Sequence, residues 1–375
     1  SKSNKNLQKM KIVLYVILAI ITAVVGLFVW AYFYNPIPKL EIPDGVTEQK
    51  RVELIDHWFS EIHADGKFNG GVLITKNGKP LLAKTYGFEN AEKNKALSNH
   101  SLFRLASVSK QFTAGGIMVL KEQNKLEYDD LVSKHIPDFP YEKVTIRHLL
   151  NQTSGVPDVY LDLAEKNKKE IGVLTNQKAL NLLIKSHPKP DFKPNDKFVY
   201  SNTNYIILAC IIELISGESI EDFMKTNLFI PLGMNETRVW NLISEDKTFE
   251  GKTEGFYTRG KKTNIVTPSF IDGVAGDGGV FSSINDFIIW DQFWYGNAII
   301  SEEHMKEAFK KPVLNDGSVS DYGFGWIIVN DDVMMHNGKW LAASTSIMRN
   351  IKKKTCIVVL DNSSNLYFDE IMKNF

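Results

Sequence analysis

Cysteine and closely spaced metal ligands are scarce in this sequence. Its 375 residues include two cysteines and eight histidines, and no two histidines have the His-x-x-x-His spacing of a helical metal site. Cys210 and Cys356 lie in apolar runs, which favours buried free thiols over a disulfide or a nucleophile. The glycine cluster at 276–279 lacks P-loop spacing and indicates a turn rather than a phosphate cradle. We therefore expect no metal site and no cofactor.

An excess of charge of either sign is also missing. The chain has 44 Lys and Arg residues against 44 Asp and Glu residues, so its formal net charge at pH 7 is zero. Proteins that bind nucleic acids usually carry a basic excess, and no nucleic-acid partner is expected here. No internal repeat is visible. The length and the ordinary apolar fraction are sufficient to bury a sizeable core.

One long stretch without charge stands near the N-terminus, at 12–34. It exceeds the roughly 20 residues that cross a bilayer and ends in aromatic residues. Four lysines precede it, at Lys2, Lys5, Lys9 and Lys11. The positive-inside rule then predicts a cytoplasmic tail (1–11), a single transmembrane helix in the cell membrane (12–34) and a periplasmic or extracellular remainder. A cleavable signal peptide is the alternative, but no clear small-x-small cleavage site is present.

The rest of the chain is predicted to be a short linker (35–45) followed by one domain (46–375). Asn77-Gly78 is a strong hairpin signal between two apolar runs. Strands are expected at 71–75, 80–83, 325–329, 344–349 and 355–360, after an amphipathic helix at 46–63. The residues between these groups are mainly helical in pattern. We expect an α+β fold with three layers (α/β/α), in which both chain ends build one antiparallel sheet around an inserted helical region.

A Ser-x-x-Lys motif is the first candidate for chemistry, and it occurs three times. Ser107 and Lys110 lie in a helix-permissive run, where residues three apart share a face. The partial positive charge of a helix N-terminus would favour an anion near Ser107. The copy at 186–189 contains a proline, and the copy at 244–247 lies in a polar segment. We therefore predict Ser107 as a nucleophile with Lys110 beside it.

A Tyr-x-Asn motif is the second candidate, at Tyr200 and Asn202. It follows a turn-rich approach and precedes the apolar run 205–215, which is typical of a buried helix. Tyr200 could act as a phenolate base if Lys110 lowered its pKa. A core tyrosine with Asn202 capping the helix is the equally weighted alternative for this segment. A second copy, Tyr295 to Asn297, shows that the motif alone is not specific.

The third candidate is His336-Asn337-Gly338, the single His-x-Gly in the chain. Its neighbours predict a strand edge, although His and Gly alone more often mark a turn. Beside a nucleophile, the N–H of Lys339 and the N–H of Ser107 could bind an oxyanion. Gly338 would let the backbone approach the substrate closely.

In this order the three motifs resemble the serine β-lactamase and penicillin-binding-protein superfamily, in particular the esterases and D-peptidases related to class C β-lactamases. The resemblance runs from about residue 68 to residue 362. Its further marks are Phe103-Arg104-Leu105-Ala106 before the nucleophile, His148 to Gly155, Pro231 to Met234, Gly276-Asp277-Gly278-Gly279, and Tyr322 to Trp326. The resemblance implies that Ser107 is acylated, that Lys110 and Tyr200 exchange protons, and that Asn202 orients the acyl group.

The third motif departs from the class C pattern, which has Lys-Thr-Gly where this chain has His336-Asn337-Gly338. A histidine at its ordinary pKa is mostly neutral at pH 7, so His336 should bind a substrate carboxylate less strongly than lysine would. Lowering the pH toward 6 should protonate His336 and strengthen that binding. The Gly-rich run usual after this motif is replaced by 339–343, which predicts a differently shaped substrate mouth.

These observations predict a membrane-anchored serine hydrolase that forms an acyl-enzyme on Ser107. The expected partners are small-molecule or peptide substrates, namely peptides, esters or cell-wall-derived amides; no oligomeric state is predicted. A D-peptidase or esterase-like enzyme, able to bind penicillin, ranks above a weak β-lactamase. A non-catalytic penicillin-binding-like sensor or wall-interaction protein is the alternative from another class, and the intact set of Ser107, Lys110 and Tyr200 argues against it. Either Lys110 or Tyr200 can be the base.

Overall fold

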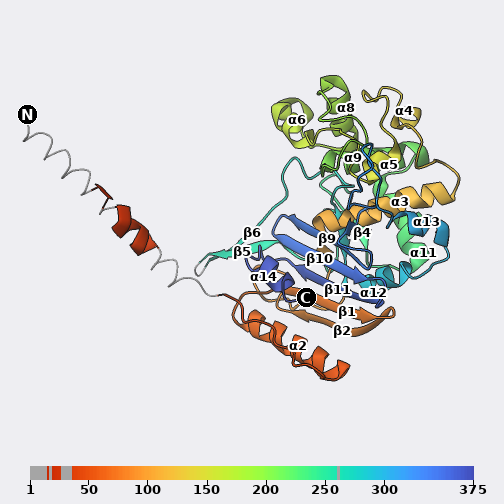
Figure 1. Ribbon diagram of the computed structural model, residues 1–375. Helices are drawn as coiled ribbons and strands as arrows, with labels where there is room; N and C mark the ends of the chain where they lie inside the picture. Colours follow the sequence, from red (N-terminus) through yellow and green to blue (C-terminus); the bar gives the residue numbers. More distant parts are fainter. Residues whose placement is uncertain (1–14, 17–18, 27–35, 260–261) are drawn as a thin grey trace, which may run out of the picture.

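The computed structural model describes residues 15–16, 19–26, 36–259 and 262–375 (Figure 1). The predicted cytoplasmic tail, 1–11, lies outside these residues, and the predicted transmembrane helix, 12–34, is described only in part. Its described residues are helical. Across the described part of the chain, no helix combines the length and the apolar character that crossing a membrane requires.

Both ends of the domain at 46–375 contribute strands to one six-stranded antiparallel sheet. Its order is β2-β1-β11-β10-β9-β8. The strands are β1 (Gly70–Lys76), β2 (Lys79–Tyr86), β8 (Ile327–Ile328), β9 (Val333–Trp340), β10 (Ala343–Asn350) and β11 (Thr355–Asp361). The register joins Gly70 of β1 to Asp361 of β11, so residues from opposite ends of the chain are direct neighbours. The predicted antiparallel sheet built from both chain ends is confirmed.

The turn between β1 and β2 follows its sequence signal. Asn77 and Gly78 have φ angles of 53° and 71°, and two consecutive positive φ angles are the requirement of the favoured two-residue hairpin turn. At the other edge, β8 is shorter than expected and pairs only with Met334 and Met335 of β9. The outer edge of β9 beyond Met335 therefore has no strand partner in the described residues.

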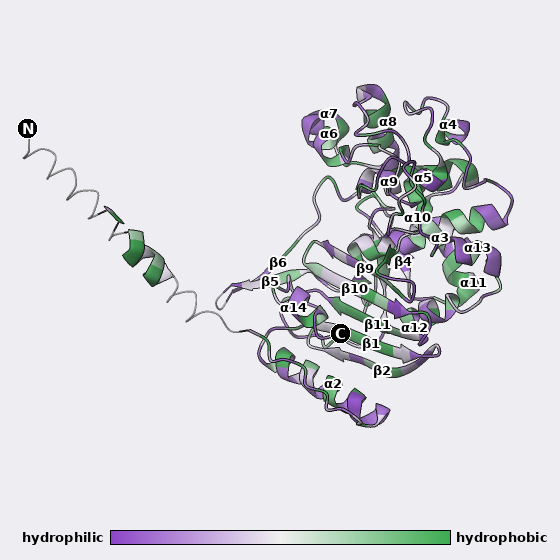
Figure 2. Cartoon of the chain, in the orientation of Figure 1, coloured by the Kyte–Doolittle hydropathy of each residue, from purple (hydrophilic) through white to green (hydrophobic). Residues whose placement is uncertain are grey.

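Helices cover both faces of the sheet (Figures 1 and 2). On one face, α2 (Glu48–Ala64) and α14 (Phe368–Met372) pack with β1, β2 and β11 in a cluster that includes Trp58, Phe59 and Val359. On the other face, α3 (Ser109–Glu122) and α12 (Ile284–Phe293) belong to the main hydrophobic core. Helices on both faces give the three layers that the sequence predicts.

The inserted region between β2 and β8 is mostly helical, and its residues 132–216 form the upper lobe in Figure 1. Its remaining helices are α4 (Val132–His135), α5 (Ile146–Leu150), α6 (Tyr160–Lys166), α7 (Lys168–Ile171), α8 (Asn176–Ser186), α9 (Asn202–Ser216), α10 (Ile220–Met224), α11 (Ile230–Leu232) and α13 (Glu302–Glu307). Two small sheets accompany them: β3 (Phe103–Arg104), β7 (Val280–Ser282) and β4 (Arg238–Val239) form one, and β5 (Phe256–Arg259) and β6 (Lys262–Ile265) form the other. Cys210 and Cys356 are buried free thiols, as predicted.

Candidate active site

Ser107 lies in a tight turn between strand β3 and helix α3. Residues Ala106–Val108 form one turn of 3₁₀-helix, and α3 begins at Ser109. The expectation of one continuous helix through the motif is therefore corrected: Ser107 precedes the α-helix. Ala106 has a φ of 48°, a left-handed conformation that non-glycine residues adopt at a cost and that often occurs at functional turns. This turn presents the half-buried Ser107 at the start of α3.

Lys110 lies directly behind Ser107 and is fully buried. Its Nζ donates to the Ser107 Oγ at 3.2 Å, to the Asn202 Oδ1 at 2.9 Å and to the Asp277 backbone carbonyl at 2.9 Å. These three acceptors match the three protons of an ammonium group. The predicted pairing of Ser107 with Lys110 is thus present in the geometry, and Asn202 joins it from the middle of the inserted region.

Tyr200 and Asn202 approach this lysine at the start of α9. The ring of Tyr200 lies 4.9 Å from the Lys110 Nζ, and its hydroxyl has no hydrogen-bond partner among the described residues. Ser201 is the N-cap of α9, and Asn202 makes no capping hydrogen bond. Asn202 instead donates through Nδ2 to Asp158 at 3.1 Å. The alternative in which Asn202 caps the helix is therefore wrong.

Gly338 brings strand β9 against the turn that carries Ser107. A Cβ on Gly338 would lie 2.4 Å from the Leu105 carbonyl oxygen, 2.5 Å from the Thr345 Oγ1 and 2.8 Å from the Ser107 backbone nitrogen. Such contacts exclude any side chain, so only glycine permits this approach. The next residue, Lys339, is exposed and lies on the open edge of β9. The two predicted oxyanion donors, the N–H groups of Ser107 and Lys339, thus belong to adjoining segments.

His336 is buried behind this edge rather than exposed to the substrate. Its Nδ1 lies 2.7 Å from the Asn337 carbonyl oxygen, which can only accept, so this nitrogen carries a proton. Its Nε2 lies 2.9 Å from the Tyr322 hydroxyl. Burial, and then the nearby Lys110 charge, lower the pKa of His336 to about 3. The expectation that His336 gains charge near pH 6 is therefore corrected: the imidazole stays neutral there.

This neutral imidazole makes folding stability depend on pH. In the unfolded chain His336 has its ordinary pKa of 6.5, whereas in the folded chain it protonates only near 3. Between these two pH values the unfolded state binds a proton that the folded state does not. The contribution of His336 to the free energy of unfolding is therefore complete above pH 6.5 and is lost as the pH falls, by about 1.4 kcal/mol per pH unit. Between about pH 7.5 and about pH 5.5 we expect the wild-type chain to lose about 1.4 kcal/mol more than His336→Gln, measured by urea unfolding. Equal losses in the two proteins would contradict a depressed pKa.

Three further residues support the site. The Tyr160 hydroxyl donates to the Asp277 Oδ2 at 2.7 Å, and burial raises the pKa of Asp277. Asp158 accepts from Asn202 and also from the Thr203 backbone N–H at 3.0 Å, which fixes the start of α9. Asp277 lies in the glycine cluster that the sequence singles out. Nothing in the sequence around Tyr160 or Asp158 signals their roles, because their partners are far away along the chain.

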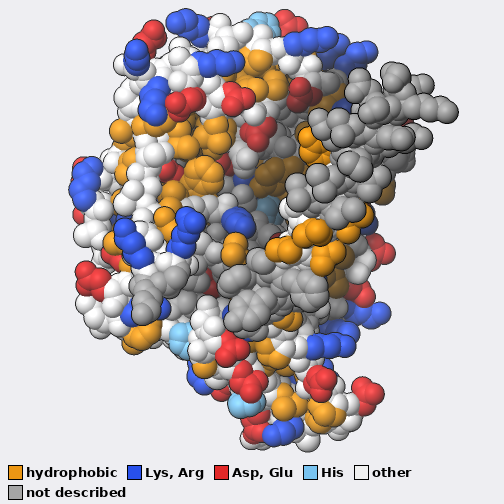
Figure 3. Space-filling model, turned by 90° about the vertical axis from the view of Figure 1, so that its left-hand side faces the viewer, with side chains coloured by type: hydrophobic (Ala, Val, Ile, Leu, Met, Phe, Trp, Pro, Cys, Tyr) orange, Lys and Arg blue, Asp and Glu red, His pale blue; other side chains and the backbone are white. Residues whose placement is uncertain are grey.

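A cavity of about 260 Å³ opens at Ser107. Of the predicted residues, Ser107, Asn202 and Lys339 line it, whereas Lys110, Tyr200, His336 and Gly338 do not. Its other lining residues include Arg104, Tyr160, Trp240, Asp272 and Trp340. Figure 3 shows the side of the molecule that carries the β5–β6 hairpin, where the surface is hollowed and hydrophobic side chains gather above the hollow. The cavity is large enough for a short acyl chain and has both polar and aromatic walls.

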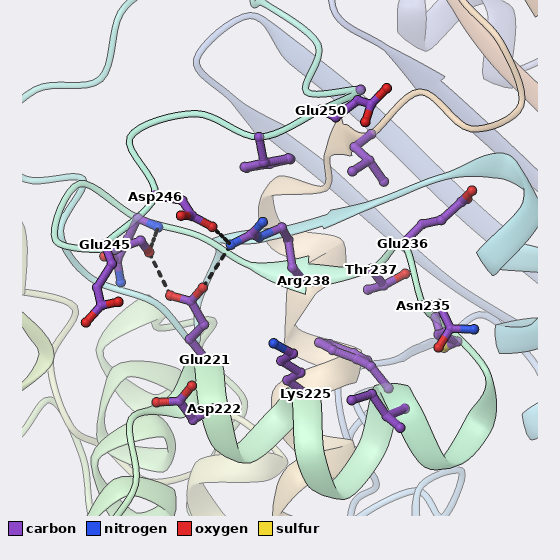
Figure 4. A pocket seen from close by; sticks show the side chains of 18 of the residues that line it. Glu221, Asp222, Lys225, Asn235, Glu236, Thr237, Arg238, Glu245, Asp246 and Glu250 are labelled. Carbon is purple, nitrogen blue, oxygen red and sulfur yellow. Dashed lines mark hydrogen bonds and ion pairs between the residues drawn. The ribbon is translucent and has the colours of Figure 1, made fainter.

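A larger cavity, of about 1180 Å³, lies elsewhere (Figure 4), and its lining includes Ser244, the serine of a rival Ser-x-x-Lys copy. There the Ser244 Oγ donates to the Glu221 carboxylate at 2.8 Å, and Lys247 donates to the Ser244 carbonyl rather than to its hydroxyl. Arg238 joins Glu221 to Asp246. This copy is part of an ion-pair cluster and lacks the serine-lysine contact that Ser107 has. Among the described residues, no group of acidic, histidine or cysteine side chains could hold a metal ion.

Comparisons with known proteins agree with the geometry. The family model "Beta-lactamase" matches residues 55–374. Penicillin-binding protein 4* of Bacillus subtilis (strain 168) is 37% identical over 328 residues, which are 84% of this chain and 72% of that protein. The octameric penicillin-binding protein homologue of Pyrococcus abyssi has 26% identity and a TM-score of 0.71, over 87% of this chain and 76% of that one. The D-amino acid amidase of Ochrobactrum anthropi SV3, with 20% identity and a TM-score of 0.69 over 88% and 96% of the two chains, shares the fold.

Proposed function

The chain belongs to the beta-lactamase family of serine hydrolases, and from that premise we propose that it forms an acyl-enzyme on Ser107 with peptide, ester or cell-wall-derived amide substrates. The observation that carries the proposal is the Lys110 Nζ, 3.2 Å from the Ser107 Oγ and held in place by Asn202 and Asp277. A serine hydroxyl becomes a nucleophile only when its proton can leave. A buried cation fixed at this distance stabilises the negative charge that develops on the Ser107 Oγ as its proton passes to a separate base.

The surroundings of Lys110 support Tyr200 as the proton acceptor. Three acceptors surround the Lys110 Nζ, and the ammonium group donates one proton to each of them. A charged ammonium donates to the Ser107 Oγ and cannot take its proton. The Tyr200 hydroxyl has no hydrogen-bond partner among the described residues, and the centroid of its ring lies 4.9 Å from the Lys110 Nζ, so its oxygen is free to accept a proton beside the Ser107–Lys110 pair. Tyr200 would then take the proton from Ser107 and return it to the leaving group.

The backbone at β9 supports stabilisation of the tetrahedral intermediate. Gly338 places the strand against the Ser107 N–H, and the Lys339 N–H is the second predicted donor. Two such donors aimed at a developing oxyanion each contribute on the order of 10²–10³ to the rate in related chemistry. Water would then attack the acyl-enzyme. Tyr200 would take a proton from this water and return it to the Ser107 Oγ, which releases the product and restores Ser107.

Within this class we propose a D-peptidase or esterase-like activity rather than an efficient β-lactamase. The neutral, buried His336 leaves the third motif without a fixed cation for a substrate carboxylate. A β-lactam that acylates Ser107 and leaves slowly is the second candidate ligand, and the 37% identity to a protein named for penicillin binding favours it. The uncharged run 12–34, with lysines before it, supports a membrane anchor with the catalytic domain on the outer side.

Intact-protein mass spectrometry of the full chain tests this function. We expect a covalent adduct on the peptide that contains Ser107 after exposure to a fluorescent penicillin, to an aryl ester or to a peptide ending in two D-amino acids. Ester or peptide should also turn over many times per chain. A stoichiometric burst with no turnover of any of them would support the sensor alternative instead. The absence of any adduct would contradict the proposal.

A further inference from the structure

Arg104 carries a guanidinium group that nothing in the described part of the chain neutralises. Arg104 is the second residue of β3, just ahead of the Ser107 turn, and its guanidinium lies over the Phe281 ring at 4.7 Å. It makes no hydrogen bond or ion pair with a described residue. Burial lowers the pKa of Arg104 to about 10, so the group remains charged at neutral pH. A guanidinium has five donors, and Arg104, which is half-buried and lines a cavity, has no protein acceptor for any of them.

The carboxylates nearby are engaged elsewhere. Asp272 influences the pKa of Arg104, but its Oδ1 accepts from the Trp340 indole and its Oδ2 from the Ser269 backbone N–H, each at 2.6 Å. Glu254 accepts from the Ala91 backbone N–H at 3.0 Å. Neither carboxylate forms the paired hydrogen bonds that an arginine fork prefers. The guanidinium therefore lacks a partner although acidic residues are close.

A second cation lies in the same region without an anionic partner. The Lys252 Nζ is 3.3 Å from the centroid of the Trp240 ring and forms no ion pair with a described residue. Burial, then the charges of Arg104 and Arg238, lower the pKa of Lys252 to about 8. Both cations lie against the Phe281 ring, the Arg104 guanidinium at 4.7 Å and the Lys252 Nζ at 5.7 Å from its centroid. Two like charges that share one ring raise each other's energy unless an anion comes between them. Arg104 and Lys252 thus form a cationic pair that lacks its counterion.

The pair borders the space in which the substrate must lie. Arg104 lines the 260 Å³ cavity at Ser107, and it also lines an adjoining cavity of about 240 Å³ together with Lys252. The edge of β9 runs past Ser107 from His336 to Trp340, and Trp340 lines the cavity at Ser107. Arg104 therefore lies toward the Trp340 end of the site.

The two ends of the site receive different parts of the substrate. The leaving group must take up a proton, so under the proposed mechanism it departs beside Tyr200, whose ring lies 6.2 Å from that of His336. The portion that remains on Ser107 then extends in the other direction, toward Trp340 and Arg104. Lys339 also lines the cavity, but it is exposed, and an ion pair formed there would be weakened by water and salt.

We propose that Arg104, with Lys252 beside it, binds a carboxylate on the acyl portion of the substrate, so that the enzyme selects anionic acyl donors. This inference rests on the proposed acyl-enzyme at Ser107 and names its substrate class. A planar carboxylate fits the guanidinium with two parallel hydrogen bonds. The carboxylates of Asp272 and Glu254 would repel a more highly charged group, which favours a monoanion.

Paired aryl esters with the same leaving group test the proposal. One ester carries a terminal carboxylate on its acyl chain (a glutarate monoester), and the other is the neutral methyl ester of the same chain. We expect the full chain to prefer the carboxylate ester by at least about tenfold in kcat/KM, because hydrogen bonds to charged groups are the strong ones. Arg104→Met should reduce this preference by about tenfold or more, and Arg104→Lys should restore part of it.

The controls locate the effect. Arg51→Met, at an exposed position on α2, should leave the preference unchanged. An ester with its carboxylate on the leaving group should show no dependence on Arg104. If Arg104→Met does not fold, the wild-type ratio of kcat/KM for the carboxylate ester to that for the neutral ester is compared with the ratio for Lys252→Met. We expect Lys252→Met to reduce this ratio by about threefold. A wild-type ratio near one, or a ratio that neither substitution changes, would overturn the proposal. A wild-type chain that neither ester acylates would instead contradict the proposed function.

Discussion

Ser107→Ala is expected to abolish covalent labelling of the full chain by a fluorophosphonate and by a fluorescent penicillin. The reason is chemical: alanine has no oxygen to form the acyl or phosphonyl bond, and the copy at Ser244 gives its hydroxyl to Glu221. The effect is all-or-none, because the residual catalysis of a site without its nucleophile leaves no adduct. Gel fluorescence and intact mass measure it directly.

A matched variant controls for damage to the fold. Ser186→Ala alters a serine in another Ser-x-x-Lys copy, at an exposed position at the end of α8. It should be labelled like the wild type, and both variants should unfold at about the wild-type temperature. A label that persists on Ser107→Ala, at wild-type intensity, would place the nucleophile elsewhere.

Lys110→Met is expected to reduce the acylation rate by roughly 10²–10⁴, the usual range for assistance in proton transfer. Methionine has a similar length but no donor, so the Ser107 Oγ loses its contact and the Asn202 and Asp277 oxygens lose theirs. Because two partly buried acceptors are left without a donor, the variant should also lose about 1 kcal/mol of stability for each. Rapid-mixing measurements of acylation with a chromogenic penicillin give the rate, and urea unfolding gives the stability.

Comparison with Tyr200→Phe separates the two roles. If Lys110 stabilises a phenolate at Tyr200, each single substitution removes the same proton path and the double variant should be little slower than the slower single one. Losses that multiply would show that the two residues act independently. Lys189→Met, in the exposed copy at 186–189, should acylate at the wild-type rate. Acylation of Lys110→Met at that rate would exclude Lys110 from the reaction.

Local spacing explains which parts of the site could be predicted. Ser107 and Lys110 are close along the chain, so any helical turn brings them together, and the interruption of the helix at Ser109 does not change that. The hairpin at Asn77-Gly78 and the sheet strands likewise follow from short patterns. The order of motifs then allowed Asn202 to be placed near Lys110, although 92 residues separate the two in the chain.

Short sequence patterns could not predict properties that depend on residues far apart along the chain. The pKa of His336 is set by burial under Tyr322 and by the Lys110 charge, and neither is visible in the motif itself. Tyr160 meets Asp277 across 117 residues. Arg104 belongs to a motif that the sequence analysis recognised, but whether its guanidinium has an acceptor depends on the residues from other segments that surround it in the folded protein. The predicted transmembrane helix lies largely outside the described residues and stays a prediction.

The pairing of β1 with β11 has a consequence for how this protein reaches its working state. Gly70 must find Asp361, so the central strands cannot close until β11 has been synthesised. Such distant pairing makes folding slow and leaves β1 with unsatisfied backbone groups during synthesis. Nascent chains are therefore exposed to aggregation until β11 has emerged from the ribosome, and a protease that clips the chain ahead of β11 would reopen the same edge. Because β9 and β10, against which the turn at Ser107 packs, reach β1 only through β11, the complete sheet behind the site also requires β11.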